Sequence, residues 1–408
     1  MRLHFDLVLL CLLCACGLPP AEEEAPGNGA LEAPLCAAPA YTQPLPVFGN
    51  SGPCQVDRSS PEPSQWVTTP SPGPVGAPGS IQYGIADPDD PTKRWDVYAN
   101  LTYAVRGGRA LQGDLWIPHG PRTVKPGILV GIHGGGWKEC NRRRDAVHDF
   151  IRRVARESGA AFFNIEYRLS QEGGMFPENL RDVKCALQFV TAKARRYALP
   201  VDPDRLGVLG ESAGAHLSAM LALTQHRDDL DPGCTSDGMP VPRPKVVAAW
   251  AFSPVADLPS LAFSTSAAAD APRLYTNNAC APGVSVDASA CTCGVANRCV
   301  DASPLQHACG LSFAAGTRLT LIHAPRTTSG AEYDALIPLE QPFRLFAAVS
   351  AFTPERAALW VPDEAAVRAW GCDADGDVPD SAHGFSPCLT MPLAPRLLTS
   401  IHEVLGGS

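Results

Sequence analysis

The hydrophobic residues of this chain first follow a two-residue period and later form short continuous runs. Every second residue from Val97 to Val105 is hydrophobic, and a second run through Leu115-Trp116-Ile117 follows the pair Gly107-Gly108. Alternation on both sides of a glycine pair predicts a β-hairpin.

Beyond this hairpin, continuous hydrophobic runs alternate with amphipathic stretches. The runs span Gly127 to Ile132, Ala160 to Ile165, Arg205 to Leu209, Val246 to Phe252, Leu319 to Ile322 and Ala358 to Val361. Helical periodicity occupies residues 142–157, 177–197, 213–225, 339–350 and 389–405. Fully hydrophobic strands between helices are typical of a mainly parallel sheet covered on both faces, so the pattern predicts an α/β fold.

Two stretches depart from this rhythm. Residues 17–92 are acidic and then Pro-rich, with little periodicity, which predicts a disordered tether and places the folded domain at 93–408. Residues from about 253 to 316 are rich in small residues and cysteine, which predicts an insertion pinned by disulfides. In an open α/β sheet the ligand lies outside the carboxyl ends of the strands, so a lid or substrate wall and plain loop packing are both open interpretations of this insertion.

The N-terminus predicts export. The hydrophobic run Leu7 to Leu13 is too short to span a bilayer. The segment Leu13-Cys-Ala-Cys16 resembles a bacterial lipobox, which predicts a signal peptide over residues 1–16 and lipidation of Cys16. An ordinary cleaved signal is the alternative, because Asp6 weakens the basic region. We expect contact with a membrane only through this anchor, and Gly17 favours the outer membrane in a Gram-negative cell.

The composition bears on the size of the core and on whether the protein can bind nucleic acid. Hydrophobic residues make up 45% of the chain, enough for a sizeable core, while Lys+Arg 33 against Asp+Glu 42 gives a net charge of −9. A chain without a basic excess offers no electrostatic footprint for a polyanion. We therefore expect no nucleic-acid partner.

Cysteine usage agrees with export. Three of the 15 cysteines lie in the leader, which leaves an even number, and an even number outside a reducing compartment predicts disulfides. Proximity in sequence pairs Cys36 with Cys54 and Cys372 with Cys388. The connectivity of a third, dense group stays open: Cys234, Cys280, Cys291, Cys293, Cys299 and Cys309.

The first chemical motif is Gly210-Glu211-Ser212-Ala213-Gly214, between the hydrophobic run that begins at Arg205 and a predicted helix. Glycines on both sides permit a tight strand-turn-helix corner that holds Ser212 strained with its hydroxyl exposed. The positive end of the helix also points at this hydroxyl. The context therefore favours a nucleophile over a structural turn.

The second motif is His133-Gly-Gly-Gly-Trp137, at the end of the strand that begins at Gly127. Acyl transfer passes through an oxyanion that needs preorganised backbone donors close to the reacting carbon. Glycines let the backbone approach without side-chain clash. We therefore predict that the N–H groups of Gly135, Gly136 and Ala213 form an oxyanion hole.

A serine nucleophile needs a base, and the base needs an acid that orients it, in the chain order Ser, acid, His. Of the histidines after Ser212, we predict that His383 is the base, because it follows the last strand in a loop that can reach over the sheet. Five others are predicted to be packing or surface residues or to lie in the wrong place: His216, His226, His307, His323 and His402.

For the acid, Asp334 follows the strand Leu319 to Ile322 and precedes a helix, which places it at the carboxyl end of the penultimate strand. We predict that Asp334 is the acid. Glu332, Asp301 and Asp257 are the rival candidates.

Several motifs together resemble one family: His133 to Trp137, Glu166-Tyr-Arg-Leu-Ser170, Phe176-Pro177, Asp182-Val-Lys184, Gly210 to Gly214, Ser303-Pro-Leu305, Leu321-Ile-His323, Asp334-Ala-Leu-Ile-Pro338 and His383-Gly-Phe385. The chain resembles the α/β-hydrolase esterases of the hormone-sensitive-lipase-like and BD-FAE-like branch, which includes carboxylesterases and carbohydrate esterases. The resemblance implies an α/β-hydrolase fold, a Ser212, His383 and Asp334 triad, and no cofactor.

The chain departs from this family in three places. Ten residues separate His323 from Asp334, where the family places the acid only a few residues after the His, and Ala215 stands where Gly is common. The segment from Pro362 to Ala382 is longer than usual, and a Cys372–Cys388 bridge would brace the His383 loop.

Two possible metal sites are weaker interpretations. Cys291-Thr-Cys293 lacks the paired CxxC spacing of zinc sites. The acidic turn Asp373-Ala-Asp375-Gly-Asp377 does not fit the EF-hand pattern, which leaves a looser calcium site against a plain turn. We expect no metal or organic cofactor in the reaction.

The expected activity is hydrolysis of short acyl esters or ester-substituted carbohydrate through an acyl-enzyme. Two alternatives stay open: an amidase or peptidase with the same triad, and a catalytically silent binding protein on this fold.

Overall fold

The computed structural model describes residues 80–407, except residues 144, 237–238, 267, 290–295 and 373–381. Several predicted features lie outside the described residues: the signal peptide with Cys16, the Cys36–Cys54 pair, Cys291 and Cys293, and the acidic turn Asp373 to Asp377. These stay predictions.

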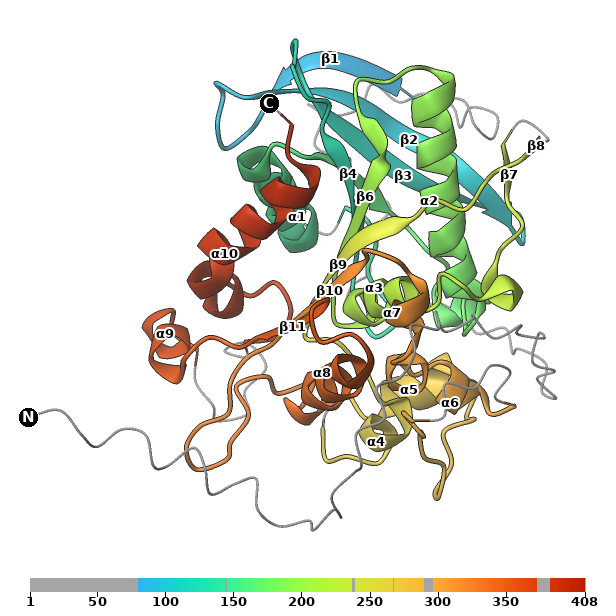
Figure 1. Ribbon diagram of the computed structural model, residues 1–408, viewed down its shortest axis with the longest axis vertical. Coiled ribbons are helices and arrows are strands. Elements are labelled where there is room, and N and C mark those ends of the chain that lie inside the picture. The colour runs from blue at the N-terminus through green and yellow to red at the C-terminus, as the bar shows by residue number, and fades with distance from the viewer. Residues whose placement is uncertain are drawn as a thin grey trace, which may run out of the picture. The chain divides into compact units, whose positions relative to one another are not determined.

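The described residues form a nine-stranded sheet and a separate short hairpin (Figure 1). The strands of the sheet are β1 (Ser80–Ala86), β2 (Arg94–Arg106), β3 (Arg109–Pro118), β4 (Gly127–Ile132), β5 (Ala161–Ile165), β6 (Asp202–Glu211), β9 (Val246–Phe252), β10 (Arg318–Ile322) and β11 (Ala357–Trp360), and the hairpin is β7 (Thr235–Ser236) and β8 (Met239–Pro240). The helices are α1 (Asp145–Ser158), α2 (Glu178–Arg196), α3 (Ala213–Leu223), α4 (Leu258–Ala262), α5 (Asp270–Tyr275), α6 (Arg298–Asp301), α7 (Gly310–Phe313), α8 (Glu340–Phe352), α9 (Glu364–Ala369) and α10 (Pro387–Leu405).

The sheet is mainly parallel, as the pattern predicts. Its strand order is β1-β2-β3-β5-β4-β6-β9-β10-β11. β1, β2, β3 and β5 pair antiparallel in turn, and every pair from β5 to β11 is parallel. The loops that follow β4, β6, β9 and β10 therefore all leave from the same edge of the sheet.

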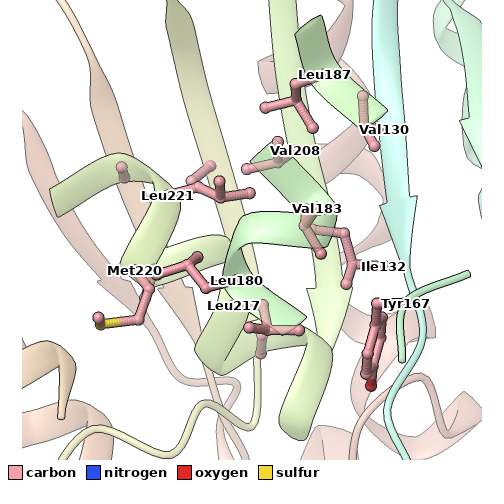
Figure 2. Close-up of a cluster of buried hydrophobic side chains, with 14 of the residues drawn as sticks. Val130, Ile132, Tyr167, Leu180, Val183, Leu187, Val208, Leu217, Met220 and Leu221 are labelled. Atoms are coloured by element: carbon pink, nitrogen blue, oxygen red, sulfur yellow. The ribbon is translucent and has the colours of Figure 1, made fainter. Parts of the chain in front are cut away.

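Hydrophobic side chains alternate between two buried clusters, one on each face of the sheet. Ile128 and Val130 pack in one cluster with residues of α2, α3 and α8, while Leu129 packs in the other with residues of α1 and α10. Figure 2 shows part of the first cluster, with Val183 of α2, Leu217 of α3 and Val208 of β6 among its labelled side chains. Burial on both faces explains why these strands read as continuous hydrophobic runs.

The N-terminal boundary of the folded part differs from the predicted one. β1 lies inside the segment 17–92 that we assigned to the tether, and it pairs with β2 as an antiparallel edge strand. Its pattern is weak because Tyr83 faces solvent with 67% of its surface exposed and Gly84 adopts a φ of +64° at a register shift. An edge strand with one exposed face and a bulge gives little hydrophobic signal.

Disulfides connect several parts of the described chain. Cys372–Cys388 forms as predicted, and Cys280–Cys299 lies within the insertion. Cys234, which we placed in the dense group, instead bonds Cys185 of α2. Cys140 and Cys309 are also disulfide-bonded.

The membrane interpretation rests on the leader alone. Within residues 80–407, apart from the gaps named above, we find no helix with the length and hydrophobicity that a bilayer crossing requires.

Candidate active site

Ser212 lies at a sharp corner between β6 and α3. Its backbone has φ 52° and ψ −117°, a conformation that a residue with a side chain rarely adopts. Only glycine fits at the two flanking positions: a Cβ at Gly210 would overlap the backbone of Gly214, and a Cβ at Gly214 would overlap the carbonyl of Ile132 at the end of β4. The corner thus presses the start of α3 against the end of β4. This strand leads into the glycine loop, His133 to Trp137.

The glycine loop after β4 turns tightly over this corner. Gly135 has a φ of +93°, and a Cβ there would overlap the carbonyl of Glu139 and lie 2.7 Å from Cys140 Sγ. Gly136 follows with a φ of +57°. In the described part of the chain, no oxygen accepts a hydrogen bond from the N–H of Gly135, Gly136 or Ala213. These are the three groups that the sequence predicts as oxyanion donors.

The predicted acid and base lie in direct contact. His383 Nδ1 is 2.9 Å from both carboxylate oxygens of Asp334. Asp334 is fully buried, and its Oδ1 also accepts the N–H groups of Leu336 (3.0 Å) and Ile337 (2.9 Å), which fixes the carboxylate. Because a carboxylate only accepts, Nδ1 carries the proton and Nε2 of His383 is left as the basic nitrogen.

The environment keeps Asp334 ionised. Burial by itself raises the pKa of this carboxyl, but the charge and hydrogen bond of His383 act against burial. The nearby His323 and a hydrogen bond from Ser253 act in the same direction, and the net result lowers the pKa of Asp334 to about 2. The carboxylate therefore stays charged at any pH at which an esterase would work.

The ten-residue gap between His323 and Asp334 forms a local excursion. Arg326 and Glu332 form an isolated antiparallel bridge, and the N–H of Thr327 donates to the carbonyl of Ala331 (2.8 Å). The chain thus leaves the end of β10, makes a hairpin-like turn and returns. Asp334 consequently stands at the strand end despite the longer spacing, and His323 Nε2 lies 3.5 Å from Asp334 Oδ2.

Apart from His323, the rival acids and bases make their contacts elsewhere. Glu332 pairs with Arg326, Asp301 with Arg227, and Asp257 with Arg344. Three buried or end-of-helix histidines make backbone contacts away from the acid: His216 to Ala302, His307 to Asp301 and His402 to Ser158. His226 stacks at a tilt on Phe313.

Two side chains at the site were not singled out from the sequence. Ser253, the first residue after β9, accepts a hydrogen bond from the N–H of Gly384 (3.0 Å), and Glu211, the residue before Ser212, accepts one from the N–H of Phe385 (3.3 Å). Glu211 was visible inside its motif, but a variable position in that motif carries no signal of its own. Ser253 directly follows a fully hydrophobic run, at the edge where parallel strands present their functional residues, and this position was the available signal.

Part of the insertion packs against the glycine loop. Tyr275 of α5 is fully buried and stacks on Trp137 with ring centroids 4.3 Å apart, and its hydroxyl donates to Asn179 Oδ1 (3.0 Å). The same helix borders a surface pocket of about 300 Å³. This pocket is lined by Met175, Asp270, Arg273, Leu274, Asn277 and Asn278. A role of the insertion as a lid or substrate wall stays a prediction.

Across the described ranges, no group of three or more His, Cys, Asp or Glu side chains is arranged to hold a metal ion.

Together, the strand order, the serine corner after β6 and the loops that carry Asp334 and His383 after later strands are those of the α/β-hydrolase fold. Within this class, residues 114–280 match the BD-FAE family model. The predicted resemblance to esterases of this fold is thereby confirmed.

Known proteins align with part of the chain. It is 37% identical over 127 residues to the probable carboxylic ester hydrolase LipM of Mycobacterium tuberculosis, covering 31% of this chain and 28% of LipM. It is 34% identical over 111 residues to neutral cholesterol ester hydrolase 1 of Bos taurus, covering 27% of each. The chain thus spans less than a third of the length of these relatives.

Among solved structures, the thermostable carboxylesterase EstE1, cloned from a metagenomic library, is 21% identical, with a TM-score of 0.49. That superposition covers 80% of this chain and 91% of EstE1.

Proposed function

We propose that the protein is a serine carboxylesterase whose triad is Ser212, His383 and Asp334. The observation that carries this proposal is the buried Asp334 bonded to His383 at the sheet edge where Ser212 occupies its strained corner. The relatives aligned above, which carry the names of ester hydrolases, support it.

The proposed reaction has two halves. Ser212 Oγ attacks the ester carbonyl while His383 Nε2 takes its proton, and the N–H groups of Gly135, Gly136 and Ala213 stabilise the oxyanion. Collapse of this intermediate expels the alcohol, which receives the proton from His383, and leaves an acyl-enzyme. Water, deprotonated by His383, then releases the acid and restores Ser212.

The test is hydrolysis of p-nitrophenyl esters from acetyl to dodecanoyl by the oxidised full chain, with Ser212→Ala as the control. We expect the native protein to cleave the short esters and the Ala variant to be inactive. Equal activity of both proteins would refute the proposal. If neither is active, labelling of Ser212 by a fluorophosphonate separates a demanding ester substrate from a silent binding protein, and a matched amide tests the amidase alternative.

For the substrate class, we propose short acyl esters, including esters on carbohydrate. The pocket beside α5 supports the second group because its amide, carboxylate and guanidinium groups suit sugar hydroxyls. We expect Asn278→Ala to raise KM for an acetylated oligosaccharide about threefold and to leave p-nitrophenyl acetate unchanged. An equal effect on both substrates would contradict a role for this pocket.

For location, we propose export and anchoring through lipid on Cys16, supported by the lipobox-like segment Leu13 to Cys16. Cys16→Ser in the full chain should move the protein from the membrane to the soluble fraction of the cell envelope. An unchanged distribution would favour the ordinary cleaved signal or another means of attachment.

A further inference from the structure

The turn that carries His383 is held through its own backbone. The N–H of Ala382 donates to the carbonyl of Tyr333 (2.8 Å), that of Gly384 to Ser253 Oγ (3.0 Å), and that of Phe385 to Glu211 Oε2 (3.3 Å). These acceptors come from the acid loop (the segment between β10 and α8 that carries Asp334), the end of β9 and the end of β6. Three parts of the sheet edge thus fix the backbone on both sides of the base.

Ser253 contacts the base turn and the acid with one hydroxyl. Its oxygen accepts the N–H of Gly384, and its proton is donated to Asp334. Ser253 itself is rigid: it is fully buried, has a φ of +50°, and donates its N–H to the carbonyl of Ile322 (2.8 Å). A change at this hydroxyl would therefore disturb the distance between acid and base.

Glu211 lies between the base turn and the glycine loop. A Cβ at Gly384 would overlap its carboxylate, and a Cβ at Gly134 would lie 3.0 Å from Oε1. The side chain is buried, with 7% of the residue exposed. Because Glu211 directly precedes Ser212, its side-chain contact with the base turn connects the position of that turn to the backbone beside the nucleophile.

We propose that Ser253 and Glu211 are positioning residues that hold the His383 turn so that Nε2 meets Ser212 Oγ. The inference rests on the proposed function, since it presupposes that His383 is the base. The Asp334 bond fixes only Nδ1 of the ring, and the ring still moves with its backbone. Misplacement of a reacting group by about 1 Å can lower the rate about a hundredfold, so backbone contacts at this turn bear directly on the chemistry.

The experiment compares variants that remove or keep each acceptor. Ser253→Ala and Ser253→Gly remove the hydroxyl, and the Gly variant also relieves the positive φ, which protects folding. Glu211→Ala removes the carboxylate, whereas Glu211→Gln keeps an oxygen for the N–H of Phe385. Ser303→Ala is the matched control: Ser303 is a buried serine of the insertion whose hydroxyl also donates (to Cys299) and accepts (from Leu258).

For the Ser253 variants and Glu211→Ala we expect kcat to fall about tenfold at nearly constant KM, which marks loss of transition-state alignment. Glu211→Gln should recover to within about threefold of native kcat. The Gln variant also removes the negative charge of Glu211 near the base. The acid limb of the pH profile of kcat/KM should therefore shift to lower pH. Ser303→Ala should keep native kcat.

Two readouts do not depend on ester turnover. The first is the rate of Ser212 labelling by a fluorophosphonate, and the second is the downfield proton NMR resonance of His383 Nδ1–H bonded to Asp334. Slower labelling and a shifted or broadened resonance in folded Ser253→Gly and Glu211→Ala would support the inference even if no ester were cleaved, in which case only the proposed function fails. Native labelling and an unchanged resonance in both variants would overturn it.

Discussion

The nucleophile corner and the base turn reach the same site in different ways. The corner is built from consecutive residues, 210–214, whose strained backbone is allowed by two glycines. The base turn is assembled from distant parts of the chain. His383 meets Asp334 across 49 residues, Gly384 meets Ser253 across 131, and Phe385 meets Glu211 across 174.

This difference predicts where substitutions act. The corner is packed against the backbone of β4, so a change there alters the fold and the activity together. The base turn is held by single hydrogen bonds that its N–H groups donate to Ser253, Glu211 and the carbonyl of Tyr333. Each of these bonds contributes about 1 kcal/mol to stability. A change there should impair the chemistry more than the fold.

The largest effect is expected from Asp334→Asn. An amide in this position can donate to His383 Nδ1 and thereby favours the wrong tautomer, so kcat should fall about 10⁴-fold while the protein stays folded. Steady-state kinetics with p-nitrophenyl acetate measure this, and Glu332→Gln, two residues earlier in a surface ion pair, should be close to native. Loss of activity in Glu332→Gln together with retention in Asp334→Asn would reverse the assignment of the acid.

Gly214→Ala should affect both the fold and the chemistry. The new methyl group would meet the carbonyl of Ile132, with His133 O 2.7 Å away, so the corner must move. We expect a loss of about 2–4 kcal/mol in the free energy of unfolding and about a 10²-fold loss of kcat/KM. Urea unfolding and kinetics check this.

The control for this prediction is Gly108→Ala in the β2–β3 turn. Gly108 has a φ of +79° but open space around its Cβ position. It should cost about 1 kcal/mol and leave activity intact. Native stability in Gly214→Ala would show that the corner is less tightly packed than its geometry indicates.

The contrast also explains what the sequence could predict. The buried strands β4, β9 and β10 match their hydrophobic runs closely, because burial on both faces favours hydrophobic residues throughout, and the polar Thr320 inside β10 is itself buried. The serine corner was readable because its glycines are adjacent in sequence. The role of Ser253 and the pairing of Cys234 with Cys185 could not be predicted from the sequence, because these contacts join segments that only the fold brings together.

The Cys372–Cys388 bridge tests the long-range side of the comparison. It closes a loop of 16 residues that contains His383, so its removal by Cys372→Ser with Cys388→Ser should lower the free energy of unfolding by about 3 kcal/mol. We also expect kcat to fall several-fold, because the loop carries the base.

Removal of the Cys280–Cys299 bridge is the matched control, since it spans 19 residues within the insertion. It should destabilise the protein by a similar amount and leave kcat unchanged. If both double variants lose kcat equally, the effect is one of general stability and the base turn has no special dependence on its bridge.

The smallest expected effects concern the pH dependence of stability, which should differ between the corner and the acid loop. Beside the corner, burial lowers the pKa of His216 to about 4, so folding favours the neutral ring, and this group lowers stability as the pH falls from about 6.5 towards 4. In the acid loop, the pKa of Asp334 is lowered to about 2, so its contribution is present above about pH 4 and is lost as the pH falls towards 2. Across each of these two pH windows, the free energy of unfolding should change by about 2–3 kcal/mol.

Urea unfolding between pH 7 and pH 2.5 resolves these windows. His216→Gln, which keeps a donor for the carbonyl of Ala302, should flatten only the upper window, and part of that slope should persist because the pKa values of His226 and His307 are also lowered. Asp334→Asn should flatten only the lower one. If His216→Gln left the upper window unchanged while Asp334→Asn removed both, the corner would depend on the acid loop for its stability, and the separation between a locally encoded corner and a long-range base turn would fail.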